Sequence, residues 1–344
     1  YREMDMLLAT GEQQSASLLA MTLNNMDCKA ISLTGWQAGI QSDSTYSKAK
    51  ISGMANQRIF NEINQENVVV IAGFQGISPE GDITTLGRGG SDTTAVALAA
   101  SLNAEKCMIF TDVDGVFTAD PRIVADAKKL SKVSYEEMLE MASLGAGIMH
   151  SRAAECAMFY NVKVEVGNSF NNSPGTLITE VANMEKHRVV SGIAHDKNCA
   201  RIAIFDVPDK PGIAMVLFKA LAKVGINVDM VIQSAMRDNR NDIAFTIEQD
   251  DLEKAVPVME KLVKEICASG MSYVDDVAKV SIVGAGMQSN PGAAADMFEA
   301  LAEEDINIHM ISTSEIKVSC LIDLCEIEKA VKVLHKKFAL DKLV

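Results

Sequence analysis

Short apolar runs alternate with longer amphipathic stretches through the first half of the chain. The short runs have the length and composition of strands, and they cover residues 29–34, 68–72, 107–111 and 162–166. The run VVVIA at 68–72 is typical of a strand buried on both faces of a parallel sheet. Apolar residues at helical spacing predict helices over residues 13–25, 47–64, 93–103 and 151–160, and Ser134 with Glu137 forms a capping box that opens another helix. Strands separated by crossover helices indicate an α/β sandwich.

The second half of the chain is a duplication. A turn cluster, Asn-Asn-Ser-Pro-Gly at 171–175, precedes a charged stretch at 185–188, and we place a domain boundary there. Short motifs then recur at a constant offset of 80 positions: Pro-Gly at 211 and 291, Ala-Leu-Ala at 220 and 300, Ile-Asn at 226 and 306. Each copy is interpreted as strand, helix, two strands, helix and strand, which is the ferredoxin-like βαββαβ order.

Composition narrows the class of protein. The chain has 344 residues, 48% hydrophobic and 23% charged, which predicts a globular protein of two or three domains. A net charge of −14 without a dense Lys/Arg cluster argues against a nucleic-acid partner. The apolar runs are far shorter than the ~20 residues of a membrane helix, so no membrane partner is expected. Seven scattered cysteines without a CxxC pair predict reduced thiols in a cytoplasmic protein and no Cys/His metal site.

The densest chemical signal is TTLGRGGSDTT at residues 84–94, which follows a strand and leads into a helix. Its three glycines allow close approach of the backbone to a ligand. Ser91 or Asp92 is expected to cap the helix, where free N–H groups attract an anion. Arg88 supplies a planar fork suited to a carboxylate. The alternative is a turn that only caps the helix, but an Arg between glycines at the carboxyl end of a strand favours a binding loop.

A second loop, TDVDGVFTADPR at residues 111–122, also follows a strand. Its carboxylates suit a divalent ion and its arginine suits a phosphate, which together indicate a nucleotide site. Asp114-Gly115 is equally interpreted as an ordinary turn. A weaker feature is Gly11 beside Glu12, where the glycine is expected to interrupt a helix and a solvated glutamate is the simpler interpretation. No GxxxxGK[ST] loop occurs, which excludes a P-loop kinase.

These motifs resemble the amino-acid kinase superfamily, and specifically the aspartate kinases. The resemblance rests on the two loops, on REMDMLLATGEQQS and VVVIAGFQG, and on DKPG…INVDMVIQS and SNPG…INIHMISTSEIK, which resemble twin ACT regulatory domains. It implies an α/β fold: a three-layer αβα amino-acid kinase sandwich, N-terminally incomplete, followed by two ferredoxin-like ACT domains. The implied domains are residues 1–184 for the kinase, 200–270 for the first ACT domain, and 188–199 plus 271–344 for the second, into which the first is inserted.

The resemblance implies an enzyme that uses ATP and Mg to phosphorylate the side-chain carboxylate of L-aspartate, giving ADP and 4-phospho-L-aspartate. This is the first step of lysine, threonine and methionine biosynthesis. Glu12 would hold the substrate amino group, Arg88 its α-carboxylate, and Asp92 would organise the catalytic centre. Phosphoryl transfer of this kind needs donors and a metal rather than a strong base. The other implied substrate residues are Phe74, Gly89, Gly90 and Ser91. The implied ATP-binding residues are Thr111, Asp112, Phe117, Thr118, Ala119, Asp120, Pro121 and Arg122.

For the ACT domains the resemblance implies feedback inhibition by lysine, threonine or both. The implied effector residues are Asp209, Gly212, Ala214, Asn227, Asp229 and Gln233 in the first copy and Asn307, Ile308, Thr313, Ser314 and Glu315 in the second. Pro-Gly and Ile-Asn are equally signatures of the fold. ACT units expose sheet edges, which predicts a homodimer or higher homo-oligomer. The alternative function is a non-catalytic regulatory subunit that binds amino acids.

Three departures from the family pattern stand out. The family begins with a strand and a Lys-[Phe/Tyr]-Gly-Gly loop whose lysine contacts the phosphates, whereas this chain begins at Tyr1. A protein starting there is expected to lack kinase activity. Gly147 stands where many members have a lysine on the phosphate side. Phe117 stands where several relatives have tyrosine, which keeps stacking and removes a hydroxyl.

Overall fold

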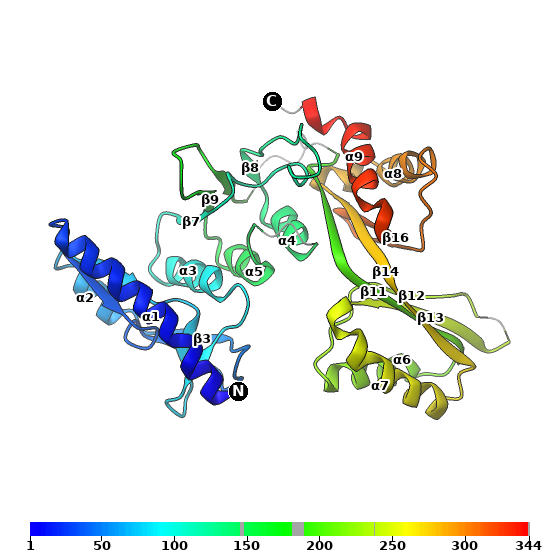
Figure 1. Cartoon of the computed structure of the whole chain (residues 1–344), viewed down its shortest axis with the longest axis horizontal. Coiled ribbons are helices and arrows are strands. Elements are labelled where there is room, and N and C mark those ends of the chain that lie inside the picture. Colours follow the sequence, from blue (N-terminus) through cyan, green and yellow to red (C-terminus); the bar gives the residue numbers. More distant parts are fainter. Residues whose placement is uncertain (145–147, 181–188, 237, 343–344) are drawn as a thin grey trace. The chain divides into compact units, whose positions relative to one another are not determined.

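The computed structural model describes residues 1–144, 148–180, 189–236 and 238–342. The chain forms two compact units (Figure 1). The first unit comprises Tyr1–Val116, Lys129–Ser143 and Gly147–Ala182, and the second comprises Phe117–Lys128, Leu144–Ala146 and Asn183–Val344. Within the described parts of the chain, no helix has the length and apolar character that crossing a bilayer requires.

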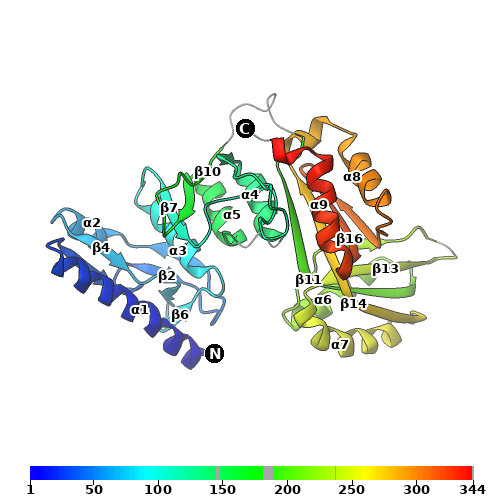
Figure 2. The same ribbon diagram turned by 45° about the horizontal axis from the view of Figure 1, so that its top comes forward.

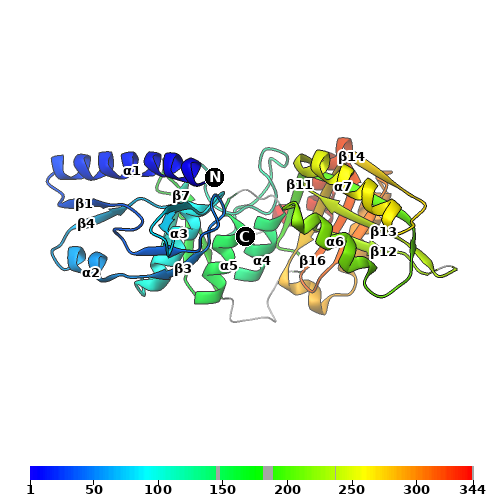
Figure 3. The ribbon, with the colours of Figure 1, turned by 90° about the horizontal axis from the view of Figure 1, so that it is seen from below.

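The N-terminal part of the first unit has helices on both sides of a strand pair (Figure 3). Helix α1 (Arg2–Asn25) packs on β1 (Ala30–Leu33) and β4 (Val68–Ile71), which pair in parallel. Helix α2 (Gln57–Ile63) packs on β4 from the other side. A four-stranded sheet of order β3-β2-β5-β6 follows, formed by Ile51–Met54, Ile40–Ser42, Gln75–Ile77 and Ile83–Thr85.

The remaining sheet of this unit contains the strand that precedes the second loop. Strand β7 (Cys107–Thr111) runs parallel to β9 (Val164–Asn168). Strands β10 (Thr176–Ile178) and β8 (Lys132–Val133) complete the sheet, whose order is β7-β9-β10-β8. Helix α5 (Ser151–Tyr160) packs on α3 (Gly90–Ser101) and α4 (Tyr135–Ser143). The predicted capping box of α4 is confirmed. Ser134 Oγ accepts the Glu137 N–H at 3.1 Å, and Glu137 Oε2 accepts the Ser134 N–H at 3.2 Å.

Three local predictions in this unit are wrong. Residues 47–64 are not one helix, because β3 pairs with β2 and the chain is helical only in α2. Gly11 does not interrupt α1, since one glycine costs about 1 kcal/mol in a helix interior and the long helix offsets it. Strand β4 is not buried on both faces, because Val68 is 44% exposed.

The second unit is built on one six-stranded sheet of order β12-β13-β11-β14-β16-β15. Its central strands β11 (Gly192–Pro208) and β14 (Gly270–Val283) pair antiparallel and serve both repeats. The outer strands are β12 (Val231–Gln233), β13 (Arg240–Ile247), β16 (Lys317–Asp323) and β15 (Met310–Thr313). Helices α6 (Ile213–Lys223) and α7 (Leu252–Glu265) cover the first repeat, and α8 (Ala293–Ala302) and α9 (Ile327–Lys337) cover the second (Figure 2). The predicted ferredoxin-like order is confirmed.

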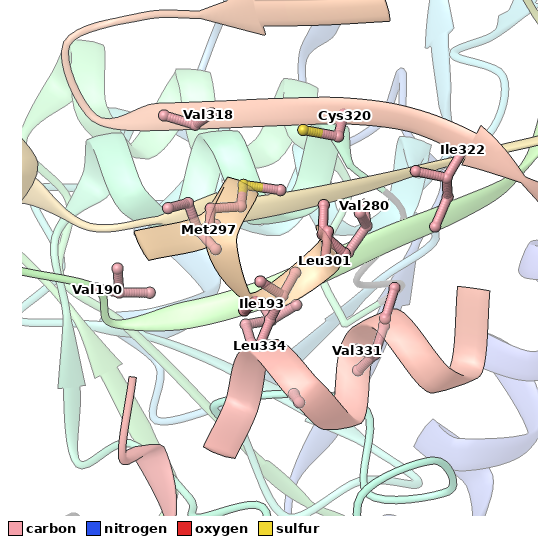
Figure 4. Close-up of a cluster of buried hydrophobic side chains, with 14 of the residues drawn as sticks. Val190, Ile193, Val280, Met297, Leu301, Val318, Cys320, Ile322, Val331 and Leu334 are labelled. Carbon is pink, nitrogen blue, oxygen red and sulfur yellow. The ribbon is translucent and has the colours of Figure 1, made fainter. Parts of the chain in front are cut away.

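Each repeat has its own hydrophobic core between helices and sheet. In the first repeat, Leu221 of α6 packs with Phe245 of β13, and both are fully buried. In the second, Leu301 of α8 and Leu334 of α9 pack against Ile193 of β11 (Figure 4). Burial of one such side chain contributes roughly 1.5–3 kcal/mol.

The segment of residues 117–128 packs with the second unit, although it lies within the first half of the sequence. Ala119 and Val124 are buried in the core of the second repeat, with Ile123 and Ala127 packed at its margin. A hydrophobic pattern along the chain shows that such residues are buried. It does not show which core they join.

Candidate functional site

The predicted substrate loop joins β6 to α3 and contains a left-handed glycine. Gly89 (φ 70°) is the N-cap of α3, so the prediction that Ser91 or Asp92 caps this helix is wrong. Both residues lie in the first helical turn, where backbone N–H groups lack intrahelical acceptors. The Asp92 carboxylate accepts the backbone N–H of His150 at 3.4 Å. The exposed Arg88 side chain immediately precedes these donors, which together suit an anion.

Steric fit explains the three glycines of this loop. A Cβ at Gly90 would lie 2.8 Å from the ring of Phe74, and one at Gly89 would lie 2.2 Å from the His150 side chain. A Cβ at Gly87 (φ 75°) would meet the carbonyl oxygen of Ser47 at 2.7 Å. Phe74 is itself held by its N–H, which donates to Thr94 Oγ1 at 3.1 Å. The loop therefore has one tightly packed conformation.

Two residues that the sequence analysis does not single out hold this loop in place. His150 is the N-cap of α5, and its Nδ1 accepts the Arg152 N–H at 3.3 Å. Burial lowers the pKa of His150 and the charge of Arg152 lowers it further, so the imidazole is neutral at pH 7. The Arg152 guanidinium donates to the carbonyls of Leu86 (2.5 Å) and Ala49 (3.0 Å). These partners are far apart in sequence, so no local motif indicates them.

A buried carboxylate ties α1 to the same loop. Asp5 is fully buried and accepts four hydrogen bonds, from the N–H and hydroxyl groups of Ser47 and Thr85, at 2.8–3.0 Å. A buried charge requires such partners. Glu12 lies seven residues later on the same face of α1, roughly 10 Å along the helix axis, and is half-buried. The predicted amino-group ligand is therefore on the face of α1 that Asp5 anchors.

The second loop is divided between the two units. Thr111 and Asp112 belong to the first unit, where the Thr111 hydroxyl donates to the exposed Asp112 carboxylate at 3.1 Å. Asp114 accepts the side-chain amides of Asn171 and Asn168, both at 2.8 Å, and these bonds lower its pKa. Gly115 (φ 137°) packs against Thr176. These contacts favour the structural interpretation of Asp114-Gly115.

The other predicted ATP residues, Phe117–Arg122, belong to the second unit. Thr118 and Ala119 are buried, Phe117 is half-buried, and Pro121 and Arg122 are exposed. The Arg122 guanidinium donates to the Asp120 carboxylate at 2.8 and 3.0 Å and lowers its pKa. A planar cation is thereby held at the surface of a well-packed segment.

Four of the predicted effector residues line one pocket of about 350 Å³ in the first repeat: Asp209, Gly212, Ala214 and Gln233. Asn241 of β13, which the sequence analysis does not single out, also lines it. Its amide donates to Asp209 at 3.3 Å, and its buried Oδ1 has no protein partner. A buried acceptor of this kind calls for a donor such as an ammonium group. The pocket thus suits a small amino acid.

The remaining predicted effector residues lie elsewhere in the unit. Asn227 is exposed, and the Asp229 carboxylate pairs with the ammonium of Lys279, a residue of β14 that is only 4% exposed. In the second repeat, Asn307 and Ile308 precede β15 while Thr313, Ser314 and Glu315 lie at its end. The four-residue strand separates these two groups by about 13 Å.

Two further predictions concern metal and thiol chemistry. No three His, Cys, Asp or Glu side chains among the described residues are grouped so that they could hold a metal ion. The seven cysteines are free thiols, as the sequence predicts. Gly147, where the family resemblance led us to expect a lysine, lies outside the described residues.

Comparison with known proteins identifies the family. Residues 1–168 match the amino acid kinase family, and residues 206–262 and 280–338 match an ACT domain. An aspartokinase of Bacillus sp. (strain MGA3) is 50% identical over 339 residues, which are 98% of this chain and 82% of that protein. The structure of E. coli aspartokinase III in complex with aspartate and ADP matches with a TM-score of 0.83 at 26% identity, over 97% of this chain and 75% of that one. That enzyme in complex with lysine and aspartate matches over the same shares with a TM-score of 0.76, also at 26% identity. The chain therefore belongs to the aspartate kinase family, as a kinase unit followed by two ACT domains.

Proposed function

We propose that this protein transfers the γ-phosphoryl group of ATP to the side-chain carboxylate of L-aspartate. An aspartate oxygen bonds to the γ-phosphorus, the bond from that phosphorus to the β–γ bridging oxygen breaks, and ADP leaves beside 4-phospho-L-aspartate. The observation that carries the proposal is the tightly packed glycine loop, with helix N-terminal donors beside an exposed arginine. The aspartate and ADP bound to E. coli aspartokinase III support it.

The loop residues have distinct roles in this proposal. Arg88 binds the α-carboxylate of aspartate, Glu12 binds its ammonium group, and Phe74 and the Gly89–Ser91 backbone enclose it. The attacking carboxylate is already ionised at pH 7, so no general base is needed. In this proposal the neutral His150 side chain packs against Gly89 and takes no proton from the substrate. Asp92, held by the His150 N–H, organises the centre.

ATP is assigned to residues 111–112 and 117–122, with Arg122 assigned to phosphate contact. Mg²⁺ bound to a nucleotide is usually held by one or two carboxylates together with phosphate oxygens. Asp92 and Asp112 fit that requirement: Asp92 lies in the first turn of α3, Asp112 directly follows β7, and among the described contacts neither carboxylate is paired with a cation. When bound, the ion would neutralise charge on the phosphates.

The regulatory part of the proposal concerns lysine and threonine. We assign the first-repeat pocket to one of these amino acids, with Asp209 and Asn241 meeting its ammonium group. The lysine bound to E. coli aspartokinase III supports an effector of this kind. Feedback inhibition would suit the first step of lysine, threonine and methionine biosynthesis, which we place in the cytoplasm. Because β12 and β15 are the edge strands of the sheet, we propose that they mediate homodimer formation.

The domain scheme is part of the same proposal: residues 1–184, 200–270, and 188–199 plus 271–344. It is supported by the pairing of the N-terminal part of β11 with the part of β14 that adjoins β16. Ile193 pairs with Ile282 and Ala194 with Ser281, while Val280 pairs onward with Cys320 of β16. In this scheme the beginning of β11 belongs to the second repeat.

The decisive experiment measures aspartate-dependent ADP release with ATP and Mg²⁺, on protein expressed with any residues that its gene encodes before Tyr1. We expect activity in the wild type and a 10- to 100-fold loss of kcat/KM for aspartate in Arg88→Ala, because a charged bidentate contact is lost. Arg58→Ala is the matched control, since Arg58 lies on α2 and pairs with Glu62. A wild type that releases no ADP but binds lysine or threonine in calorimetry would favour the regulatory-subunit alternative.

A further inference from the structure

The segment 117–128 is a closed loop with its own hydrogen bonds. The Thr118 N–H donates to the Lys128 carbonyl at 2.9 Å, and the Lys128 N–H donates to Thr118 Oγ1 at 2.9 Å. Inside the loop, the N–H groups of Ile123 and Val124 donate to the Asp120 carbonyl at 3.0 and 2.9 Å. Asp120 is therefore held in a fixed relation to Thr118, two residues before it.

This loop is attached to the second repeat at three points. Ala119 and Val124 are buried in the core that Figure 4 shows between α8, α9 and the sheet. The Ile193 N–H of β11 donates to the Thr118 carbonyl at 2.8 Å. Thr118 Oγ1 lies 2.9 Å from Nε2 of His335, a residue of α9. The threonine and histidine are 0% and 3% exposed, so water does not compete for this contact.

The chemistry of this contact determines the direction of its hydrogen bond. Burial lowers the pKa of His335, so the imidazole is neutral at pH 7. Thr118 Oγ1 already accepts the Lys128 N–H, and its own proton needs an acceptor. The arrangement that satisfies both groups has the hydroxyl donating to Nε2, with the ring proton on Nδ1. An apolar side chain at 335 would leave a buried hydroxyl donor without a partner.

We propose that His335 is a positioning residue for nucleotide binding: through its hydrogen bond to Thr118, the regulatory core places Asp120 and Arg122 and thereby sets the affinity for ATP. The inference rests on the proposed function, since it takes those two residues to contact the nucleotide. His335 itself touches no substrate. Because the contact couples α9 to the loop, any effector that moves α9 would change ATP affinity, and ATP would change effector affinity by the same factor.

The test compares steady-state constants for His335→Leu, His335→Gln and the wild type at pH 7.5. We expect His335→Leu to raise KM for ATP about tenfold, the effect of one unsatisfied buried hydroxyl, with kcat and KM for aspartate changed less than twofold. His335→Gln, which keeps an amide oxygen as acceptor, should restore KM for ATP to within about threefold. The matched control is His309→Leu, which removes a histidine of the same repeat that pairs with Asp323.

Hydrogen exchange gives a readout that does not require catalysis. In His335→Leu the amides of Thr118, Lys128 and Ile193 should exchange at least tenfold faster, while those of α1 stay at the wild-type rate. If His335→Leu does not fold, His335→Asn takes its place, because its shorter amide cannot reach Thr118.

Wild-type KM for ATP in these variants, or equal changes in both KM values without rescue by glutamine, would overturn the inference and leave the proposed function standing. An inactive wild type would overturn the proposed function, and this inference with it.

Discussion

In the first repeat Asp209, Gln233 and Asn241 line a pocket, whereas the equivalent residues of the second repeat are Ser289, Thr313 and, by strand register, Ile316. The backbone plan is shared, since both copies order their helices and strands in the same way. The apolar positions are shared too: Leu221 and Leu301 occupy equivalent sites and both are fully buried. Duplication has therefore kept the residues that build the fold, while the polar residues that suit a ligand differ.

A second difference lies where the repeats meet. Asp229 of the first repeat pairs with buried Lys279, but the strand register makes His309 and Arg201 the equivalent residues. Neither of those side chains is a carboxylate, and His309 instead pairs with Asp323 at 2.7 Å. The ion pair therefore has no symmetric counterpart. It ties the loop before β12 to β14, the strand that both repeats share.

The largest expected effect tests the equivalence of the two cores. Leu221→Ala and Leu301→Ala should each destabilise their own repeat by about 2–5 kcal/mol, because both leave a cavity in a fully buried site. Only Leu301→Ala should also speed hydrogen exchange in residues 117–128, which pack on the second core. Chemical denaturation with exchange detection measures both, and faster exchange of that segment in Leu221→Ala would contradict the assignment.

The next effect concerns the unmatched ion pair. Burial by itself would lower the pKa of the Lys279 ammonium. The negative charges of Asp229 and Asp196 outweigh that effect, so the pKa is raised. Asp229→Asn should therefore destabilise the protein by about 1–3 kcal/mol, because it leaves a buried cation with Asp196 alone, 3.9 Å away. Lys279→Met should cost less, since Asp229 is half-exposed and can be hydrated. Urea midpoints at pH 7 decide the order, and the reverse order would refute this account.

A smaller effect sharpens the difference between the pockets. Asn241→Leu makes this position apolar, as it is in the second repeat, and it removes both the amide bond to Asp209 and the unpartnered acceptor. We expect lysine or threonine to bind about tenfold more weakly, with uninhibited turnover unchanged. Ser289→Ala, at the position equivalent to Asp209, serves as the control. Calorimetric affinities for both amino acids measure the effect, and unaltered binding in Asn241→Leu would remove the pocket from the proposal.

The smallest effect is a pH dependence confined to the second repeat. Burial lowers the folded-state pKa of His335 below its ordinary 6.5, against the opposing charges of Asp341 and Asp126. The unfolded chain then binds more protons between those two pKa values, so stability falls as the pH drops through 6.5. Helix α9 corresponds to α7 at an offset of 75 positions, so the equivalent residue in the first repeat is the exposed Glu260, and no buried imidazole occupies that place. Between pH 7.5 and 5.5 the loss of stability should be smaller in His335→Gln than in the wild type, and an identical loss would contradict the assignment.

The local pattern of hydrophobic and polar residues predicted most helices and strands of this protein. The predictions that were wrong show which contacts such a pattern does not encode. The capping box at Ser134 and Glu137 was predictable because its partners are three residues apart. The strand at Ile51–Met54 was missed because its hydrogen-bond partner, β2, is not encoded in the spacing of its own side chains. Gly89 was predicted to belong to a binding loop. Its role as N-cap of α3 was missed, since Ser and Asp are the commoner capping residues.

The amino-acid sequence by itself determined the mixed α/β class, the duplication and the two loops, because each is written in residues close together or in exact repetition. Only the tertiary structure decided that Asp5 holds Thr85, that His150 and Arg152 support the glycine loop, and that residues 117–128 join the second core through His335. The reason is physical. A hydrogen bond or a buried contact forms only between groups that the fold brings within a few ångströms of each other. The linear sequence contains many residues that could be either partner, so it does not show which pair meets.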